Sequence, residues 1–320
     1  MENGFLPHMK KIPVIIDCDP GHDDALMLML AFGSGRIDVK AVTISAGNQT
    51  QEKTLNNALK ILTLIGADVP VYRGAEKPMF RQLITAEYAH GETGLDGPSL
   101  PKATLTAQSQ PAHEGIAGIL AATQEKITII PTGPLTNIAI FLLAYPHLKS
   151  KIERISLMGG GIFRGNMTPL AEFNIFADPE AAAIVFSSGI PITMCGLDVT
   201  HKALVFQKDI DALRKIGNKC ATAAADLMDF FSIFYRKHRS ELDGGAALHD
   251  PCAVAWLLNP GIFRTKSCYV AVETKGELTR GTTVVDFYNV LEMEPNAEVV
   301  FDIQRSEYIA MILNAVKNLP

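Results

Sequence analysis

The stretch "IIDCDPGHDDALMLML" (residues 15–30) places four aspartates between two apolar runs. The run before them is β-branched and predicts a strand, whereas the run after them predicts a helix. Asp17, Asp19, Asp23 and Asp24 fall within eight positions, and carboxylates this close repel one another. A bound divalent cation would offset the repulsion, so the stretch predicts a ligand site where a strand meets a helix.

The same strand–loop–helix alternation continues through the first two thirds of the chain. The predicted strands are 12–17, 39–45, 69–72, 127–131, 154–158 and 190–195. Helical patterns lie between them, for example at 51–66 and 178–189. Strands that alternate with helices favour an α/β fold, with an open, mainly parallel, Rossmann-like sheet and helices on both faces.

The last third changes pattern but shows no linker or composition break. Residues 200–240 read as helical, and further helices are predicted at 250–258 and 305–319. Between them, 268–288 reads as two strands joined by a glycine-containing turn. We therefore expect a single domain over residues 1–320, with residues 1–9 as a flexible extension.

Composition excludes several classes of partner. Of 320 residues, 48% are hydrophobic, which supports a sizeable core, and the net charge is −5. The absence of a long basic run argues against nucleic acid or an anionic membrane as partner. The five cysteines form no C-x-x-C pair. No apolar run is long enough to span a bilayer, and the N-terminal "MENGFLPHMKK" lacks the apolar stretch of a signal peptide. We expect a cytoplasmic protein with reduced cysteines.

Polar side chains follow the ends of several predicted strands. Asn48 follows the second strand, "TGPLTN" follows 127–131, and Asn166, Glu172 and Asn174 follow 154–158. In open α/β sheets, ligands bind outside the carboxyl ends of the strands, so one site built from several loops is expected. Carboxylate and amide oxygens suit Ca²⁺ or Mg²⁺ rather than zinc or copper. His249 and Asp250 add a proton donor and another carboxylate.

Structural interpretations compete at several of these positions. Asp178 and Asp250 each precede a proline at the start of an apolar helix, as N-cap residues do. Asp24 could cap the helix that follows it, although a cap leaves three aspartates unexplained. Thr50 or Asn48 could cap the helix that begins at 51. Two histidines also have structural interpretations. His22 could be solvated or have a packing role, and His90 could cap a turn.

Motifs over the whole chain from Lys10 onward resemble those of the inosine–uridine-type nucleoside hydrolases. They are "DCDPGHDDA" (17–25), "AGNQT" (46–50), "HGETGLDGP" (90–98), "PTGPLTNIA" (131–139), "LMGGG" (157–161), "AEFNIFADPEAA" (171–182), "GLDVTH" (196–201) and "LHDPCAVAWLL" (248–258). Their order and spacing match the family. Within it, the chain most resembles the bacterial pyrimidine-preferring ribonucleoside hydrolases.

The resemblance implies a role for each site residue. The implied Ca²⁺ ligands are Asp19, Asp24, Asp250 and the backbone carbonyl of Thr132, with Asp17 in support. The implied ribose contacts are Asp23, Asn166, Glu172 and Asn174, with Asn48 beside both the ribose and the metal. Asp19 would act as general base toward a Ca²⁺-activated water, His249 would donate a proton to the leaving base, and His90 would belong to the base pocket.

The implied reaction is hydrolysis of the N-glycosidic bond of ribonucleosides through an oxocarbenium-like transition state. A ring of carboxylates stabilises such a positive sugar. The resemblance also implies a homo-oligomer, either dimer or tetramer, and a helical lid near 200–245. The segment 231–245 has no clean match to the family's base contacts. A purine or broad base specificity therefore stands as an alternative to pyrimidine preference.

Two more distant alternatives remain at the level of sequence. The first is a Mg²⁺-dependent aspartate-type phosphatase, although "DCDPG" lacks the hydroxyl residue expected soon after the second aspartate. The second is an inactive nucleoside-binding protein, although Asp19 and His249 are both present. Activity on nucleosides but not on nucleoside monophosphates would exclude the first, and release of free base would exclude the second.

Overall fold

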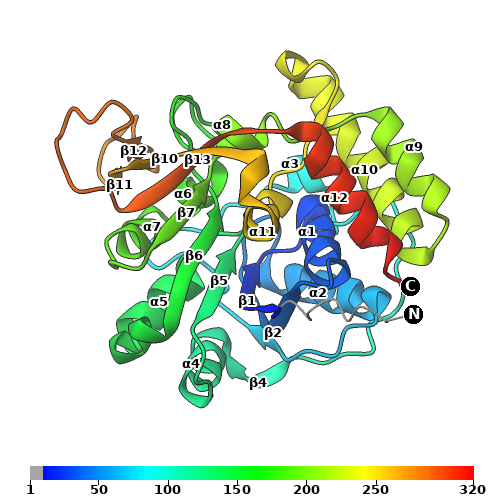
Figure 1. The fold of residues 1–320 in the computed structure, drawn as a ribbon, viewed down its shortest axis with the longest axis horizontal. Helices are drawn as coiled ribbons and strands as arrows, with labels where there is room; N and C mark the ends of the chain where they lie inside the picture. The colour runs from blue at the N-terminus through cyan, green and yellow to red at the C-terminus, as the bar shows by residue number, and fades with distance from the viewer. Residues whose placement is uncertain (1–9) are drawn as a thin grey trace, which may run out of the picture.

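The computed structural model describes residues 10–320, so the predicted extension at 1–9 lies outside the described residues. A nine-stranded sheet runs in the order β10-β13-β7-β6-β5-β1-β2-β3-β4 (Figure 1). Its strands are β1 (Ile12–Cys18), β2 (Ile37–Ile44), β3 (Val71–Arg73), β4 (Gln108–Pro111), β5 (Ile127–Pro131), β6 (Ile152–Met158), β7 (Ile192–Cys195), β10 (Phe263–Cys268) and β13 (Ala297–Ile303). All neighbouring pairs are parallel except β10 with β13.

The six predicted strands are all present, each within two residues at either end. The prediction of an open, mainly parallel sheet is confirmed. β4, β10 and β13 lie outside the predicted set. β4 is exposed at all four residues and β10 at its four central ones, so neither edge strand has the apolar pattern that marks a buried strand.

Helices cover both faces of the sheet, as the alternating pattern predicts. The longer ones are α1 (His22–Gly33), α2 (Gln51–Ile65), α4 (Ala112–Ala122), α5 (Thr136–Ala144), α7 (Pro179–Phe186), α9 (Gln207–Ile216), α10 (Lys219–His238), α11 (Pro251–Leu258) and α12 (Arg305–Lys317). Shorter helical pieces are α3 (Glu87–His90), α6 (Phe173–Ala177), α8 (Leu197–Thr200) and 3₁₀ turns at Pro146–Lys151, Ser240–Leu242 and Pro260–Ile262.

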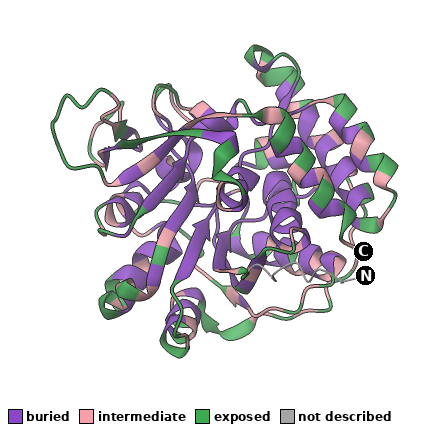
Figure 2. Ribbon diagram, in the orientation of Figure 1, coloured by how far each residue is buried: buried purple, intermediate pink, exposed green. Residues whose placement is uncertain are grey.

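Two apolar clusters lie on opposite faces of β1. Val14 and Ile16 belong to a cluster with α1, α2, α10, α11 and α12, whereas Ile15 belongs to a cluster with α4, α5 and α7. Successive strand side chains point to opposite faces, which explains the division. Figure 2 shows the central strands and α1 as almost wholly buried. Every residue from Ala25 to Ala31 is completely buried, as expected for a helix that is apolar all round.

The C-terminal third also follows the sequence prediction. α11 and α12 occupy the predicted helical segments, and α9 and α10 fill most of 200–240. The segment 268–288 contains the antiparallel pair β11 (Val270–Val272) and β12 (Thr283–Val285). A second small pair, β8 (Leu204–Val205) with β9 (Ala246–Ala247), closes the loop that carries α9 and α10. No helix within residues 10–320 is long and apolar enough to cross a membrane.

The strand order reverses next to β1, and this reversal positions the site. β2, β3 and β4 follow one another on one side of β1, whereas β5, β6 and β7 lie on the other side. The carboxyl ends of β1 and β5 therefore flank a topological switch point, where open α/β sheets bind ligands. Asp19 follows β1 and Thr132 follows β5.

Candidate active site

Asp17 is the penultimate residue of β1 and anchors the floor of the site. Its carboxylate accepts hydrogen bonds from Thr43 Oγ1 on β2 and from Asn137 Nδ2 on α5, the latter at 2.8 Å. Complete burial raises the pKa of Asp17 to about 7, despite the two hydrogen bonds, which lower it. Asp17 thus links β1 to two neighbouring elements behind the site, consistent with the supporting role expected for it.

Asp19 lies just beyond β1, between two glycines. A Cβ added at Gly47 would lie 2.0 Å from Asp19 Oδ2, and one added at Gly133 would lie 2.5 Å from Oδ1. The glycines of "AGNQT" and "PTGPLT" are therefore needed so that backbone can approach this carboxylate. Oδ2 accepts a 2.7 Å hydrogen bond from the backbone N–H of Asn48. Oδ1 is buried and has no hydrogen-bond partner among the described residues.

Asp24 lies inside the first turn of α1, at the third helical position, and its side chain caps the helix from there as the acidic member of a capping box. The helix begins at His22, and Asp24 Oδ2 accepts a 3.0 Å bond from the backbone N–H of Gly21. The same oxygen accepts a 3.1 Å bond from Asn48 Nδ2, while Oδ1 accepts a 2.8 Å bond from Thr132 Oγ1. Asp24 thereby joins three loops.

The helix that begins at Gln51 has no side-chain cap. Its N-cap residue is Thr50, whose side chain makes no capping bond. Asn48 instead directs its amide toward the backbone carbonyl of Asp19 at 3.1 Å and toward Asp24. Neither side chain caps the helix: Thr50 makes no capping bond, and the amide of Asn48 belongs to the acidic site.

The two Asp-Pro sequences have opposite roles. Asp178 caps α7 by accepting from the backbone N–H of Ala181 at 3.1 Å, as the capping interpretation predicts. Asp250 occupies the N-cap position of α11, but its side chain accepts no capping bond. Its carboxylate instead lies with those of Asp23 and Asp24, with one oxygen of each within 4.8 Å of the others.

This acidic group fits a hard divalent cation. Asp19 Oδ1 and Asp23 Oδ1 are buried without a partner, and the donors are all oxygens. Burial, reinforced by the neighbouring carboxylates, raises the pKa of Asp19 and Asp250 well above their usual range and that of Asp23 to about 7. The closest three carboxylates include Asp23 and leave out Asp19. The division of metal and ribose roles between these two, and the role of the Thr132 carbonyl, stay predictions.

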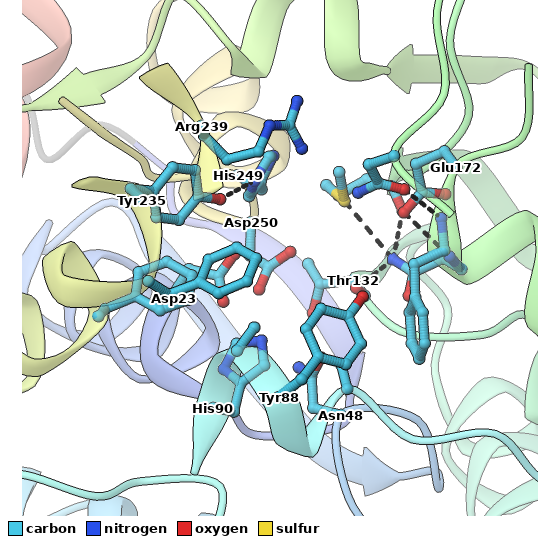
Figure 3. Close-up of a pocket in the computed structure, with 18 residues that line it drawn as sticks. Asp23, Asn48, Tyr88, His90, Thr132, Glu172, Tyr235, Arg239, His249 and Asp250 are labelled. Atoms are coloured by element: carbon cyan, nitrogen blue, oxygen red, sulfur yellow. Dashed lines mark hydrogen bonds between the residues drawn. The ribbon is translucent and has the colours of Figure 1, made fainter. Parts of the chain in front are cut away.

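A cavity of ≈ 160 Å³ opens beside the acidic group (Figure 3). Asp23, Asp250, Asn48 and Thr132 line one part of it, and Glu172 lies across from them. The cavity brings together residues from loops after β1, β2, β5 and β6. The predicted assembly of one site from several strand ends is therefore observed.

Glu172 is held in the cavity wall by backbone donors. Its carboxylate accepts from the backbone N–H groups of Asn174 at 2.9 Å and of Gly160 at 2.9 Å. Burial raises the pKa of Glu172 to about 7. Asn174 Nδ2 donates to the carbonyl of Thr132 at 2.8 Å, and Asn166 Oδ1 accepts from the backbone of Phe173 at 2.9 Å. All three predicted ribose residues of this loop line the cavity.

His249 is bonded through both ring nitrogens. Nε2 lies 2.7 Å from the hydroxyl of Tyr235, and Nδ1 lies 2.7 Å from Thr200 Oγ1. Burial, helped by the nearby His201 and Arg239, lowers the pKa of His249 well below 6.5. The imidazole is therefore neutral at pH 7.

α10 supplies cavity residues that the sequence prediction left without a role. Phe231, Phe234 and Tyr235 line the cavity, and Arg239 lies just past the helix end. Lys237, His238 and Glu241, which lie in the same segment, do not line the cavity. The signal was available, because Phe231, Tyr235 and Arg239 are four residues apart and so share one helix face. The mobility of this helical lid stays a prediction.

His90 and His22 differ in their access to the cavity, which only His90 lines. His90, at the end of α3, lines the cavity. His22 is completely buried, so the solvated interpretation is wrong and the packing interpretation is confirmed.

Comparisons with known proteins define the class to which this site belongs. The model of the family described as inosine-uridine preferring nucleoside hydrolase matches residues 14–310, and the chain belongs to this family. It is an enzyme that hydrolyses N-glycosidic bonds of ribonucleosides, and the phosphatase alternative is excluded.

Among relatives, the chain is 53% identical over 307 residues to the pyrimidine-specific ribonucleoside hydrolase RihA of Photobacterium profundum, covering 96% of this chain and 99% of that one. It is 51% identical to RihA of Escherichia coli O81, covering 96% and 98%. A solved purine-preferring ribonucleoside hydrolase from Gardnerella vaginalis superposes with a TM-score of 0.89 at 32% identity, covering 95% and 98%. The family is metal-dependent, which agrees with the acidic group.

Proposed function

We propose that this enzyme hydrolyses pyrimidine ribonucleosides, uridine and cytidine, to free base and ribose. One observation carries the proposal: a single cavity is lined both by buried carboxylates and by the hydrogen-bonded Tyr235–His249 pair. Breaking an N-glycosidic bond leaves positive charge on the sugar and negative charge on the base. The cavity offers a partner for each charge.

The carboxylates stabilise the sugar. Asp23 and Glu172 lie on different walls of the cavity, so a ribose between them faces acidic groups on two sides. Interactions that strengthen as positive charge develops lower the barrier. Asn166 and Asn174 add amide groups for the ribose hydroxyls.

Asp19 serves as general base in this proposal. Its Oδ2 is held by Asn48, which leaves the unpaired Oδ1 to take a proton from water. A Ca²⁺ held by Asp19, Asp24, Asp250 and the Thr132 carbonyl would supply positive charge that lowers the pKa of a water at the site. The acidic oxygen donors support this choice of ion.

The Tyr235–His249 pair delivers the proton to the departing base. The imidazole first takes up a proton from solvent; the imidazolium then gives that proton from Nε2, through the Tyr235 hydroxyl, to the departing base and returns to its neutral form. Its lowered pKa makes the imidazolium the stronger acid. The 2.7 Å contact between Tyr235 and His249 is short enough for the proton to be shared between them. Thr200 at Nδ1 fixes the orientation of the ring.

Pyrimidine preference rests on the named relatives, which are described as pyrimidine-specific and are 51–53% identical to this chain. The purine-preferring structure is only 32% identical.

The test is an assay of the purified, calcium-loaded enzyme against uridine, cytidine, inosine and adenosine, with free base measured by chromatography. We expect kcat/KM for the two pyrimidine nucleosides to exceed that for the purine nucleosides. Equal or higher values for inosine would contradict pyrimidine preference, and no release of any base would contradict the function.

Removing the acid should affect only substrates that need it. We expect His249→Ala to lower kcat on uridine by about 10²–10⁴-fold, and Tyr235→Phe to lower it by less. The matched substrate is p-nitrophenyl riboside, whose leaving group departs without protonation, so both variants should hydrolyse it nearly as fast as the wild type. Equal losses on both substrates would show that His249 maintains the site instead of donating the proton.

The proposal includes a homo-oligomer, dimer or tetramer, in the cytoplasm. Five buried free cysteines suit a reducing compartment. Phe163 and Tyr288 are 61% and 75% exposed and pack against each other, and exposed aromatic groups of this kind support a protein contact. Light scattering of the purified protein would determine the number of subunits.

A further inference from the structure

Tyr88 lies at the mouth of the cavity, and the proposed mechanism gives it no task. It belongs to α3, two residues before His90, and its ring points into the cavity in Figure 3. The residue lines the cavity although its relative exposure is 61%. A ring that meets the cavity on one side and solvent on the other separates the two, so Tyr88 forms part of the wall where a substrate enters.

Two contacts hold the ring of Tyr88 across this mouth. On one side it packs against Phe234 of α10, with ring centroids 5.7 Å apart and ring planes inclined by 52°. On the other side its hydroxyl lies 4.0 Å from the sulfur of Met167, in the loop that follows β6. Tyr88 therefore joins α3 to two further walls of the cavity that come from distant parts of the chain.

These two walls have different tasks in the proposed reaction. α10 carries Tyr235, which meets the departing base, and the loop after β6 carries Asn166 and Glu172, which meet the ribose. A ring that reaches from one wall to the other lies over the boundary between base and sugar. The bond that breaks, between C1′ of the ribose and the base nitrogen, crosses the same boundary.

The backbone that carries Tyr88 is fixed by hydrogen bonds away from the mouth. The N–H of Ala86 donates to the carbonyl of Asn48 at 3.1 Å, and the N–H of Met79 donates to Asp178 Oδ2 at 2.9 Å. The ring itself is held by the two weaker contacts described above. It can therefore turn aside to admit a substrate and return while its backbone stays in place.

A cover is useful at this place because the transition state reacts with any nucleophile within reach. As the bond to the base breaks, its electron pair leaves with the base, which takes up a proton, and C1′ becomes electron-poor. In the proposed reaction the oxygen of one water then adds to C1′, while Asp19 takes a proton from that water. A closed site prevents other nucleophiles from competing with it.

We propose that Tyr88 is a substrate-binding residue whose ring covers the glycosidic bond and keeps bulk solvent away from C1′ as the base departs. This inference rests on the proposed function. The flat face of the ring carries the effect, because it packs on the substrate and excludes water. A phenylalanine at this position should therefore serve as well as the tyrosine, whereas an alanine should leave the mouth open.

Competition between water and methanol measures the shielding directly. The calcium-loaded enzyme is given uridine labelled with ¹³C at C1′ in buffer that contains methanol. NMR then separates ribose from methyl riboside, in which the oxygen of methanol has added to C1′ and its hydroxyl proton has been released. The ratio of these products does not depend on kcat, so a variant that is merely slower leaves it unchanged.

We expect the ratio of methyl riboside to ribose to be about tenfold higher in Tyr88→Ala than in the wild type, a change of ~1.4 kcal/mol in the difference between the two barriers. Tyr88→Phe should keep the wild-type ratio. KM for uridine should rise in Tyr88→Ala by up to about tenfold, the upper end of what one aromatic contact contributes.

Phe80→Ala is the matched control, because Phe80 lies in the same segment and is 75% exposed but does not line the cavity. Its product ratio and KM should equal those of the wild type. The proposal would be overturned by an unchanged ratio in Tyr88→Ala, by a similar rise in Phe80→Ala, or by a loss of shielding in Tyr88→Phe.

A second readout requires no turnover. In Tyr88→Trp, saturating D-ribose with Ca²⁺ should reduce the quenching of the added indole by acrylamide, after subtraction of the wild-type signal from Trp256. Unchanged quenching would contradict contact between this position and the sugar. If the wild type released base from no nucleoside, the proposed function would fail, and the same measurement with uridine would still decide whether Tyr88 covers a bound nucleoside.

Discussion

Asp19→Asn is expected to abolish turnover of uridine while leaving the fold intact. The loss should be at least about 10²–10⁴-fold in kcat, the range for removal of a general base. An amide has the same shape, and its oxygen can still accept the 2.7 Å bond from the backbone of Asn48. It has no lone pair with which to take a proton at the position of the unpaired Oδ1. Steady-state assays and thermal melts of the purified variant are the measurements.

Asp178→Asn is the matched control, because Asp178 is also completely buried but caps α7 away from the cavity. Its kcat should stay within about threefold of the wild type, and its melting temperature should change little, because Asn caps a helix about as well as Asp does. Near-normal turnover by Asp19→Asn would refute the assignment of the base. An equal loss in both variants would indicate general damage to the sheet.

Removal of the metal is expected to have the second large effect, and the effect should depend on pH. Chelator-treated protein should lose activity, and excess Ca²⁺ should restore it. At about 100 times its Kd, a ligand stabilises the folded state by ~2.7 kcal/mol. For a chain of this size that corresponds to an increase in Tm of several degrees, about 5 °C. Differential scanning calorimetry with and without Ca²⁺ measures it.

The sign of the pH dependence follows from the raised pKa values. Without metal, the folded pKa of Asp17 and Asp23 is about 7 against an ordinary 3.8, so between pH 4 and pH 7 the folded protein holds protons that the unfolded chain releases. The free energy of unfolding of the metal-free protein therefore falls as pH rises through this window. Ca²⁺ competes with those protons, so its effect on Tm should be larger at pH 8 than at pH 5.

Mg²⁺ at equal concentration is the control for the identity of the ion. It requires near-ideal octahedral geometry and gives up water reluctantly, so it should raise Tm less than Ca²⁺. An equal Ca²⁺ effect at pH 5 and pH 8 would contradict the proton competition. No effect at either pH would contradict the metal site itself.

Local patterns in the sequence were sufficient where the responsible interaction is itself local. The six strands of the core and the helices after them follow from short β-branched runs and apolar periodicity. The cap at Asp178 follows from an Asp-Pro pair at a helix start. The position of the polar loops followed as well, because parallel strands bring their carboxyl ends to one edge.

Other features depended on contacts between distant segments. β4 reads as polar loop, and it becomes a strand only because β3 offers it an unpaired edge. Asp250 has the same local sequence signal as Asp178, but Asp23 and Asp24 lie beside it and direct its carboxylate into the acidic group. Phe231 and Tyr235 become cavity residues only when α10 packs over the site.

The sequence by itself thus determined the sheet, the acidic loops and the class of chemistry, because strand patterns and carboxylate spacing are encoded over a few residues. Only the tertiary structure decided which Asp-Pro aspartate caps its helix and which joins the acidic group, and which residues of α10 line the cavity. Asp23, Tyr235 and Asp250 lie on three segments of the chain, and only the folded chain brings them to one cavity.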